Sequence, residues 1–369
     1  MRQGDATSRL ASLDEGSTFA FPQCREDVTP HCIEAALRGR FPDARVDSVD
    51  IVDEMLGAAV KLRLECAMKE SAGPEGPPRH MILKAHFNRL DPGLDFMFHD
   101  EVRAYRDVVG RLSVNAPACY FAGSQGRSTL LLLEDMRERG ARFGAVMRPY
   151  GFAEAAAILD QLAALHAAFW DSPHIRDGGD LAWAQLSVTG PHLAYMRAML
   201  KPDVWDSYRQ MPRAAGCPHA LASDPIRIER AILTQFASHG DGPRTLGHGD
   251  AHVANSFLDA TGGGFFDWQM RRCPWYHDVT FFIVSCLDIA DRRAWESDLL
   301  RHYLSRLAAH GVEPPSFDAA FHAYRREVIF GYVIFFSNSD WPEAPNTAAT
   351  ARFAMAAEDL GTIAAIEAD

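Results

Sequence analysis

The hydrophobic pattern of this chain changes near residue 137, and that change limits the fold more than any other feature. Before it lie four segments whose apolar and β-branched residues are typical of strands: 46–54, 58–68, 79–87 and 128–136. The run KESAGPEGPP is typical of a turn between the second and third of these segments. We therefore expect a small antiparallel sheet near the start of the chain.

Two helices are expected beside this sheet. Thr29 is a suitable helix cap, and Pro30 suits the first helical position that follows it. Between the third and fourth predicted strands, residues 95–112 have the apolar spacing of an amphipathic helix. Residues 1–25 carry no such pattern and are expected to form an irregular lead-in.

Long helical patterns dominate the remainder, and only residues 245–268 interrupt them with short strands. The helices are expected at 152–170, 224–239, 291–310, 317–336 and 349–368. The sequence thus predicts an α+β fold of two lobes with a cleft between them. Residues 26–136 would form the N-terminal lobe with the sheet, and residues 137–369 the helical C-terminal lobe.

Charge and cysteine usage exclude several classes of partner. The net charge of −12 argues against nucleic acid as a partner, because proteins that bind its backbone carry a basic stripe.

The seven cysteines are scattered and odd in number, which is typical of reduced thiols in a cytoplasmic protein. The N-terminal stretch MRQGDATSRLASLDEGSTFAFP lacks the apolar core of a secretory signal. The longest apolar runs, VTFFIVSCL and VIFGYVIFF, are too short for a membrane span, and the sequence gives no indication of the oligomeric state.

Lysine is rare in this chain, yet Lys84 lies inside a predicted strand. A buried ammonium needs a partner, although a lysine at a strand end can also extend its head to water. Glu101, at the centre of the next predicted helix, is a candidate partner. A strand lysine paired with a helix glutamate positions nucleotide phosphates in kinases. A solvated surface glutamate is the alternative.

The segment TLGHGDAHVANSFL concentrates polar side chains in a mostly apolar stretch. Asp250 precedes Asn255 by the interval that separates the base from a metal ligand in the catalytic loop of kinases. Asp267 ends the next apolar strand and offers the hard oxygen that magnesium prefers. Together these residues predict a phosphoryl-transfer site in which Asp250 accepts a hydroxyl proton.

The histidines near Asp250 have the four-residue spacing seen in some zinc sites. Zinc is disfavoured, because the flanking glycines oppose a helix and the glutamate of an HExxH pattern is missing. We expect His248 to brace the loop by hydrogen bonds, and His252 to lie near the phosphates or to pack beneath them. Asp278 is interpreted as an N-terminal helix cap that also braces the catalytic loop.

These segments resemble the aminoglycoside phosphotransferase and choline kinase group of the protein-kinase-like superfamily, and most closely its ecdysteroid-kinase-like branch. The likeness covers about residues 51–285 and rests on MILKAHF, HDEVRAYRDV, LLLLEDM, LAALHAAFW, LGHGDAHVANSFL and GGGFFDWQMRRCPWYHDVTFFI. The resemblance implies a bilobal protein-kinase-like fold that binds ATP and Mg²⁺ between its lobes. It also implies a small-molecule substrate whose hydroxyl group is phosphorylated.

The resemblance implies that the N-terminal lobe binds the nucleotide. Lys84 would contact the α and β phosphates, and Glu101 would hold Lys84 in place. Adenine would be met by backbone groups of the hinge, residues 133–136, which include Glu134 and Met136. Asp135 in this segment is either a hinge residue or a turn residue.

The C-terminal lobe would supply the catalytic base, Asp250, and the metal ligands, Asn255 and Asp267. Two departures favour a small-molecule kinase over a protein kinase. Gly57 alone stands where a protein kinase has its glycine-rich loop, so the phosphate cover must be looser or built differently. Only ten residues separate Asp267 from Asp278, too few for a phosphorylatable activation loop.

Two other functions stay open at this point. The cluster GHGDAH suggests a metallophosphoesterase, but such a site needs further ligands and no G-N-H-[DE] segment is present. A non-catalytic kinase-like binding protein would usually lack the base or a metal ligand, and both are present here. The sequence contains no Walker P-loop. It leaves open which acceptor is used and whether ATP or GTP is preferred.

Overall fold

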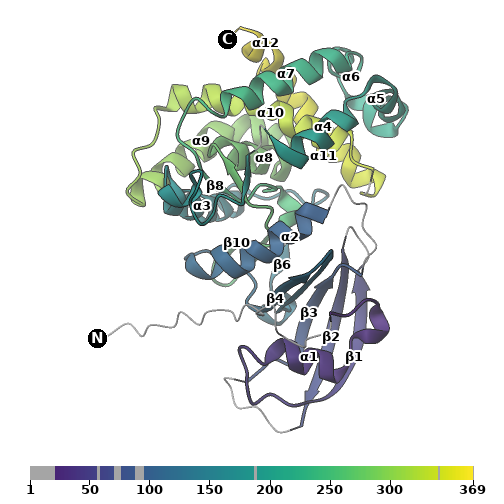
Figure 1. Ribbon diagram of the computed structural model, residues 1–369. Coiled ribbons are helices and arrows are strands. Elements are labelled where there is room, and N and C mark those ends of the chain that lie inside the picture. The colour runs from purple at the N-terminus through teal and green to yellow at the C-terminus, as the bar shows by residue number, and fades with distance from the viewer. Residues whose placement is uncertain are drawn as a thin grey trace. The chain divides into compact units, whose positions relative to one another are not determined.

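The computed structural model describes residues 21–55, 59–69, 76–87, 95–186, 189–339 and 341–368. The chain divides into two compact units (Figure 1). We call residues 1–112 and 116–141 the sheet unit, and residues 113–115 and 142–369 the helical unit. Gly57, residues 1–20 of the expected lead-in and most of the KESAGPEGPP turn lie outside the described residues.

The sheet unit contains a five-stranded antiparallel sheet, which confirms the expected α+β fold. In spatial order the strands are β1 (Val46–Met55), β2 (Val60–Met68), β3 (His80–Ala85), β5 (Ser128–Glu134) and β4 (Cys119–Gln125). The sequence predicted all of them except β4. Its small residues Ala122, Gly123 and Ser124 give β4 little of the alternation that marks a strand.

One face of this sheet is covered by α1 (Pro30–Leu37), which contacts β1 in Figure 1. The hydroxyl of Thr29 accepts a hydrogen bond from the backbone N–H of Cys32, as expected of a cap. Apolar side chains of α1 share a core with alternate residues of the strands, such as Leu62 and Leu83. A second helix, α2 (Asp95–Arg103), contacts β4 and β5.

The helical unit is built from ten described α-helices and two small sheets. The helices are α3 (Phe152–Phe169), α4 (Gly190–Met199), α5 (Pro202–Arg209), α6 (His219–Ala222), α7 (Pro225–Ser238), α8 (Tyr276–Cys286), α9 (Ile289–Ala309), α10 (Phe317–Phe336), α11 (Glu343–Asp359) and α12 (Thr362–Glu367). The strands are β6 (Arg142–Phe143), β7 (Gln185–Leu186), β8 (Thr245–Gly247), β9 (Ser256–Asp259), β10 (Gly262–Phe265) and β11 (Arg271–Cys273).

Short helical turns connect these elements. They are η1 (Arg25–Asp27), the π-helical turn η2 (Ala104–Val108), η3 (Val109–Arg111), η4 (Met136–Arg139), η5 (Pro173–Ile175), η6 (Pro212–Gly216) and η7 (Val253–Asn255). The expected closing helix 349–368 is instead two helices. The chain breaks at Gly361, whose φ of +59° is a conformation that favours glycine.

The core of the helical unit surrounds α8, which is buried along its whole length from His277 to Cys286. It contacts α3, α9, α10 and α11. A helix that is apolar on all sides requires such surroundings, and the sequence predicted a core helix here. Side chains of this buried helix hold the loop between β8 and β9 by hydrogen bonds to its backbone.

Among the described helices, α3 alone has the length and hydropathy of a membrane span. Its apolar residues face α9 and β10 inside the helical unit. That packing is typical of the core helix of a globular domain.

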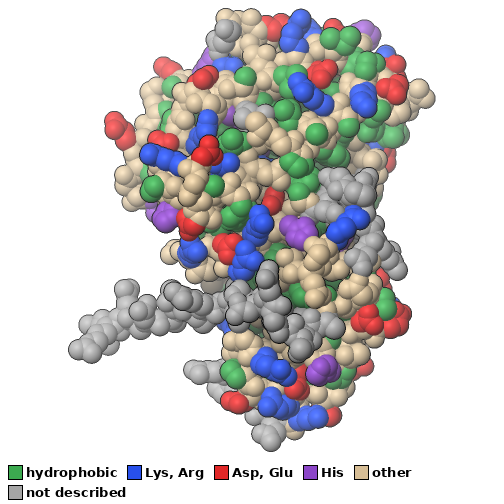
Figure 2. All heavy atoms as spheres, in the orientation of Figure 1, with side chains coloured by type: hydrophobic (Ala, Val, Ile, Leu, Met, Phe, Trp, Pro, Cys, Tyr) green, Lys and Arg blue, Asp and Glu red, His purple; other side chains and the backbone are tan. Residues whose placement is uncertain are grey.

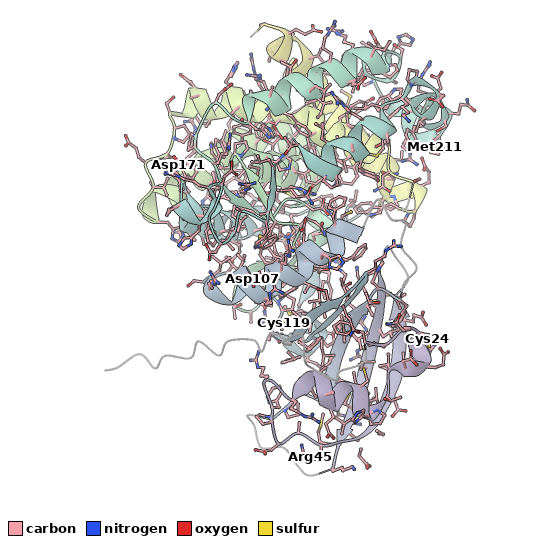
Figure 3. All side chains as sticks on the ribbon, in the orientation of Figure 1. Cys24, Arg45, Asp107, Cys119, Asp171 and Met211 are labelled. Atoms are coloured by element: carbon pink, nitrogen blue, oxygen red, sulfur yellow. The ribbon has the colours of Figure 1, made fainter. Side chains whose placement is uncertain are left out.

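Surface charge and cysteines agree with the composition. Acidic and basic side chains are interspersed on the faces of both units that Figure 2 shows. All seven cysteines are free thiols, among them Cys24 and Cys119 of the sheet unit, which Figure 3 labels. Burial raises the pKa of Cys119 to about 12, so this thiol is held in its neutral form.

Candidate functional site

Lys84 and Glu101 form a buried ion pair in the sheet unit. Lys84 lies on β3 and Glu101 on α2, and Nζ is 2.6 Å from Oε2. The two side chains are only 9% and 2% exposed. The two alternatives that the sequence left open are therefore wrong: the ammonium group of Lys84 does not extend into water, and Glu101 is not a solvated surface residue. Because removing two charges from water is costly, a buried pair of this kind is poor support for stability and suggests a binding role.

The alternation of β3 explains where this lysine projects. Met81, Leu83 and Ala85 belong to the core under α1. Successive strand residues point to opposite faces, so Lys84 projects from the other face of the sheet. There the helix α2 supplies Glu101, and the ammonium is held in a fixed place.

The hinge predicted to meet adenine begins at the end of β5. The Glu134 carboxylate accepts a hydrogen bond from the backbone N–H of Ala118 at 3.0 Å. Met136 is buried and begins η4. Asp135 accepts a hydrogen bond from the N–H of Arg137 and so caps η4, which makes it a turn residue. The adenine contacts of this segment stay a prediction.

In the helical unit, Asp250 lies in the loop between β8 and η7, and Asn255 ends η7. The Asn255 side-chain amide donates to the backbone oxygen and to Oδ2 of Asp250, both at 2.9 Å. The Asp250 side chain is 32% exposed. One carboxylate oxygen is therefore held, and the other, Oδ1, is the atom suited to accept a proton.

The electrostatic surroundings keep Asp250 ionised. Burial acts to raise the pKa of Asp250, but the interaction with the side chain of His252 lowers it, and the net pKa lies below its usual value. Asp267 is close enough to raise the pKa of Asp250 in part. The backbone N–H of Phe266, the residue before Asp267, donates to the backbone oxygen of Asn255 at 3.0 Å, so Asp267 lies next to the segment that holds Asp250.

Asp267 follows β10 with a φ of +64°, a left-handed conformation that is unusual for a residue other than glycine. Strain of this kind costs on the order of 1–3 kcal/mol and persists mainly where function requires it. Two nearby carboxylates and the amide oxygen of Asn255 are the hard donors that Mg²⁺ prefers. The residues present therefore fit a magnesium ion.

Asp278 of α8 braces the loop that contains Asp250. Its carboxylate accepts hydrogen bonds from the backbone N–H groups of His248 (2.6 Å) and Gly249 (3.0 Å). It also contacts Nε2 of His166 at 3.1 Å, and Nδ1 of that ring contacts the hydroxyl of Tyr303 at 2.8 Å. The expected capping role is wrong: Asp278 is the third residue of α8, and it bonds to the loop instead of its own helix end.

Two glycines make this close approach possible. A Cβ on Gly247 would lie 2.6 Å from Oδ2 of Asp278, and a Cβ on Gly249 would lie 2.5 Å from Cγ of Arg271. Gly249 also has a φ of +84°. Gly247 therefore leaves room for the bracing carboxylate, and Gly249 leaves room for the side chain of Arg271.

Both ring nitrogens of His248 are engaged. Nε2 contacts the backbone oxygen of Phe266 at 3.0 Å, and Nδ1 accepts from the N–H of Asp250 at 3.3 Å. Burial lowers the pKa of His248, which favours the neutral ring. This arrangement braces the loop and leaves no ring nitrogen for zinc.

Sequence reasoning missed two residues that hold this loop. His166 of α3 supports Asp278, and the hydroxyl of Ser285 accepts from the N–H of Val253 at 3.0 Å. Asp278 and Ser285 lie seven residues apart on α8, so they share one face of the helix. Two polar residues at this spacing in an otherwise apolar helix were a usable signal.

A second buried cluster lies around Glu327 of α10. Its carboxylate contacts Nε2 of His239 at 2.9 Å and Nδ1 of His277 at 2.7 Å, and it accepts from the amide of Gln235 at 2.6 Å. These three histidine and glutamate side chains have the mutual spacing of metal ligands. Since hydrogen bonds already occupy both carboxylate oxygens, we interpret the cluster as a core network.

The charge of Glu327 should make stability depend on acid pH. Burial acts to raise its pKa, but His239 and His277 lower it to about 2, against 4.5 ordinarily. Between these values the unfolded chain binds the proton more readily, so the free energy of unfolding falls as the pH falls, by on the order of 3 kcal/mol for this group. Urea unfolding at pH 6 and pH 3 should show that the free energy of unfolding falls less in Glu327→Gln than in the wild type. Equal losses in the wild type and in Glu327→Gln would contradict this prediction. The control is Glu313→Gln, because Glu313 is an exposed residue.

Comparison with known proteins bears on these residues. The model of the ecdysteroid kinase-like family matches residues 224–312, a segment that contains Asp250, Asn255 and Asp267. A choline kinase from Cryptosporidium parvum Iowa II is 10% identical, with 90% of this chain and 97% of that chain covered and a TM-score of 0.53. Comparison with curated proteins found no match.

Two further solved structures are similar over most of their length. A protein described as a fructosamine-3-kinase from Thermobifida fusca YX-ER1 is 17% identical, with 88% and 98% of the two chains covered and a TM-score of 0.46. The GDP complex of an aminoglycoside 2'-phosphotransferase is 10% identical, with 88% and 99% covered and a TM-score of 0.45. The predicted resemblance is confirmed, and the likeness to choline kinase shows the protein-kinase-like fold.

Proposed function

We propose that this chain, which resembles the ecdysteroid-kinase-like branch of the aminoglycoside phosphotransferase and choline kinase superfamily, is an ATP- and Mg²⁺-dependent phosphotransferase. Its acceptor would be a hydroxyl group of a small molecule. The observation that carries the proposal is Asp250: one carboxylate oxygen is held by Asn255, and the strained Asp267 is nearby. The family match covers these same residues.

In this proposal Asp250 is the general base. Its Oδ1 accepts the proton of the acceptor hydroxyl while that oxygen attacks the γ-phosphorus of ATP and the bond to the β-phosphate oxygen breaks. ADP leaves, and no covalent enzyme intermediate forms. Because the transition state is loose, positioning and electrostatic stabilisation supply most of the catalysis.

The remaining residues bind the nucleotide and offset its charge. Lys84 donates to the α and β phosphates, and Glu101 keeps the ammonium group in place. Asn255 and Asp267 would hold magnesium, which supplies positive charge next to the phosphoryl oxygens when bound. Glu134 and Met136 would offer backbone groups to the base of the nucleotide.

The structure supports this proposal over the other two functions. A metallophosphoesterase needs imidazole ligands, but both ring nitrogens of His248 are already engaged within the loop. A non-catalytic binding protein would usually have lost the base or a metal ligand, but Asp250, Asn255 and Asp267 are all present.

A screen of ATP consumption tests the proposal. The purified protein would be incubated with Mg-ATP and alcohols, amino alcohols, sugars, sterols or aminoglycosides, with Asp250→Asn as the blank. We expect at least one acceptor to release ADP in the wild type alone. If no acceptor raises ADP release above the blank, or if tightly held zinc, iron or manganese accompanies phosphate-ester hydrolysis, the proposal fails. A parallel series with GTP would establish the nucleotide preference.

A further inference from the structure

A hydrogen bond holds one nitrogen of the His252 ring, and the other nitrogen lies near Asp250. Nδ1 accepts a hydrogen bond from the backbone N–H of Ala254 at 3.2 Å, which makes His252 the cap of η7. A neutral imidazole has one acceptor nitrogen and one donor nitrogen. The ring proton is therefore on Nε2, and Nε2 lies 3.5 Å from Oδ2 of Asp250.

Aromatic side chains hold this ring from its other sides. The ring of Trp341 lies 5.1 Å away at an interplanar angle of 85°, and that of Phe281 lies 5.7 Å away at 89°. The centroid of the Phe335 ring lies 5.9 Å from that of the His252 ring. His252 is 7% exposed. Edge-to-face packing against several rings leaves the imidazole little freedom to turn.

The carboxylate of Asp250 needs such a neighbour. Rotation about its terminal bond has a broad and shallow preference, so the carboxylate plane is set by its hydrogen-bond partners. Asn255 holds Oδ2 at 2.9 Å, and Nε2 of His252 lies 3.5 Å from the same oxygen. Catalytic hydrogen bonds are often long without substrate and shorten in the reacting complex.

We propose that His252 is a positioning residue for the base: its Nε2–H holds Oδ2 of Asp250, so that Oδ1 presents its lone pair to the acceptor hydroxyl. This inference rests on the proposed function of Asp250. The sequence suggested only a place near the phosphates or beneath them. The structure assigns His252 a specific partner and a specific tautomer.

Two substitutions separate this role from simple capping of η7. In His252→Gln the amide nitrogen takes the place of Nε2 and keeps the donor to Asp250. In His252→Asn the side-chain oxygen takes the place of Nδ1 and keeps the cap, but the donor is lost. A positioning role predicts that Asn is the more harmful substitution, and a capping role predicts the reverse.

The assay is hydrolysis of Mg-ATP with water as the acceptor, which needs no identified substrate. We expect His252→Asn to lower kcat at least tenfold with the KM for ATP changed by less than twofold, and His252→Gln to lower kcat about threefold. If His252→Asn matches wild type, or if both variants fall equally, the inference is overturned. His302→Gln is the matched control, because Nε2 of His302 pairs with Asp160 at 2.8 Å on another part of the helical unit.

A second measurement serves if His252→Asn fails to fold and His252→Gln folds. Long-range ¹H–¹⁵N spectra of the histidine rings in the wild type should show His252 as the Nε2–H tautomer, assigned by its absence in His252→Gln. An Nδ1–H tautomer would overturn the inference. The two proposals can fail separately: if Asp250→Asn hydrolyses ATP like wild type, the proposed function fails, whereas an inactive Asp250→Asn beside a fully active His252→Asn refutes the positioning role alone.

Discussion

Replacing Asp250 with Asn should lower turnover by about 10² to 10⁴-fold while leaving the binding of Mg-ATP measurable. A general base contributes about this much to the rate, and an amide has the shape of the carboxylate but cannot take the hydroxyl proton. Asn255 donates to Oδ2, so the side-chain oxygen of the variant can still meet that donor. Steady-state ADP release gives the loss of kcat, and calorimetry gives the retained affinity.

The control for this prediction is Asp241→Asn, an exposed residue in the turn before β8. The control should turn over at the wild-type rate, because the substitution removes a similar charge at a distance from the loop. Wild-type turnover in Asp250→Asn would remove Asp250 from the mechanism. Complete loss of nucleotide binding would show that Asp250 has a different role.

Replacing Asp278 with Ala should have the largest effect on stability, a loss of about 3–5 kcal/mol in the free energy of unfolding. The carboxylate is 1% exposed and accepts from the N–H groups of His248 and Gly249. Each buried donor left without an acceptor costs about 1–3 kcal/mol. The pKa of Asp278 is lowered: burial opposes this, and the histidines around the carboxylate, His166 foremost, together outweigh the burial. Removal of the anion should also release the catalytic loop and reduce turnover.

Urea unfolding at pH 7, together with turnover at low temperature where the variant stays folded, measures both effects. Asp298→Ala, an exposed residue of α9, should change the free energy of unfolding by less than about 0.5 kcal/mol. If Asp278→Ala unfolds and turns over like wild type, the bracing network does not hold the loop.

Strong local periodicity is what made much of the fold predictable. The strand expected at 79–87 is observed as His80–Ala85, and the helix expected at 317–336 is observed with those bounds. The cap at Thr29 was also predictable, because a cap and its helix are neighbours in sequence. Features without a local signal were missed, such as the short strand β4 and the break at Gly361 within an otherwise helical pattern.

The residues of the candidate site also divide into those with a local signal in the sequence and those without one. The spacing of Asp250 and Asn255 is local, and their hydrogen bonds join residues five positions apart. His166 could not be assigned, because its partner Asp278 lies 112 positions away and only the folded chain brings the two together. The capping role of Asp278 was wrong for a related reason: the backbone of a distant loop, not the nearby helix end, supplies its donors.

The proposed function requires that Lys84 and Asp267 both contribute to the binding of one magnesium-bound nucleotide, and calorimetric titration with Mg-ATP tests this most directly. The account predicts one site in the wild type, weakened at least tenfold by Lys84→Met, by Asp267→Ala, or by removing magnesium with EDTA. Lys69→Met is the matched control, since Lys69 is an exposed lysine just after the end of β2 and this variant should bind Mg-ATP like wild type. Unchanged Mg-ATP affinity in both Lys84→Met and Asp267→Ala would contradict the account.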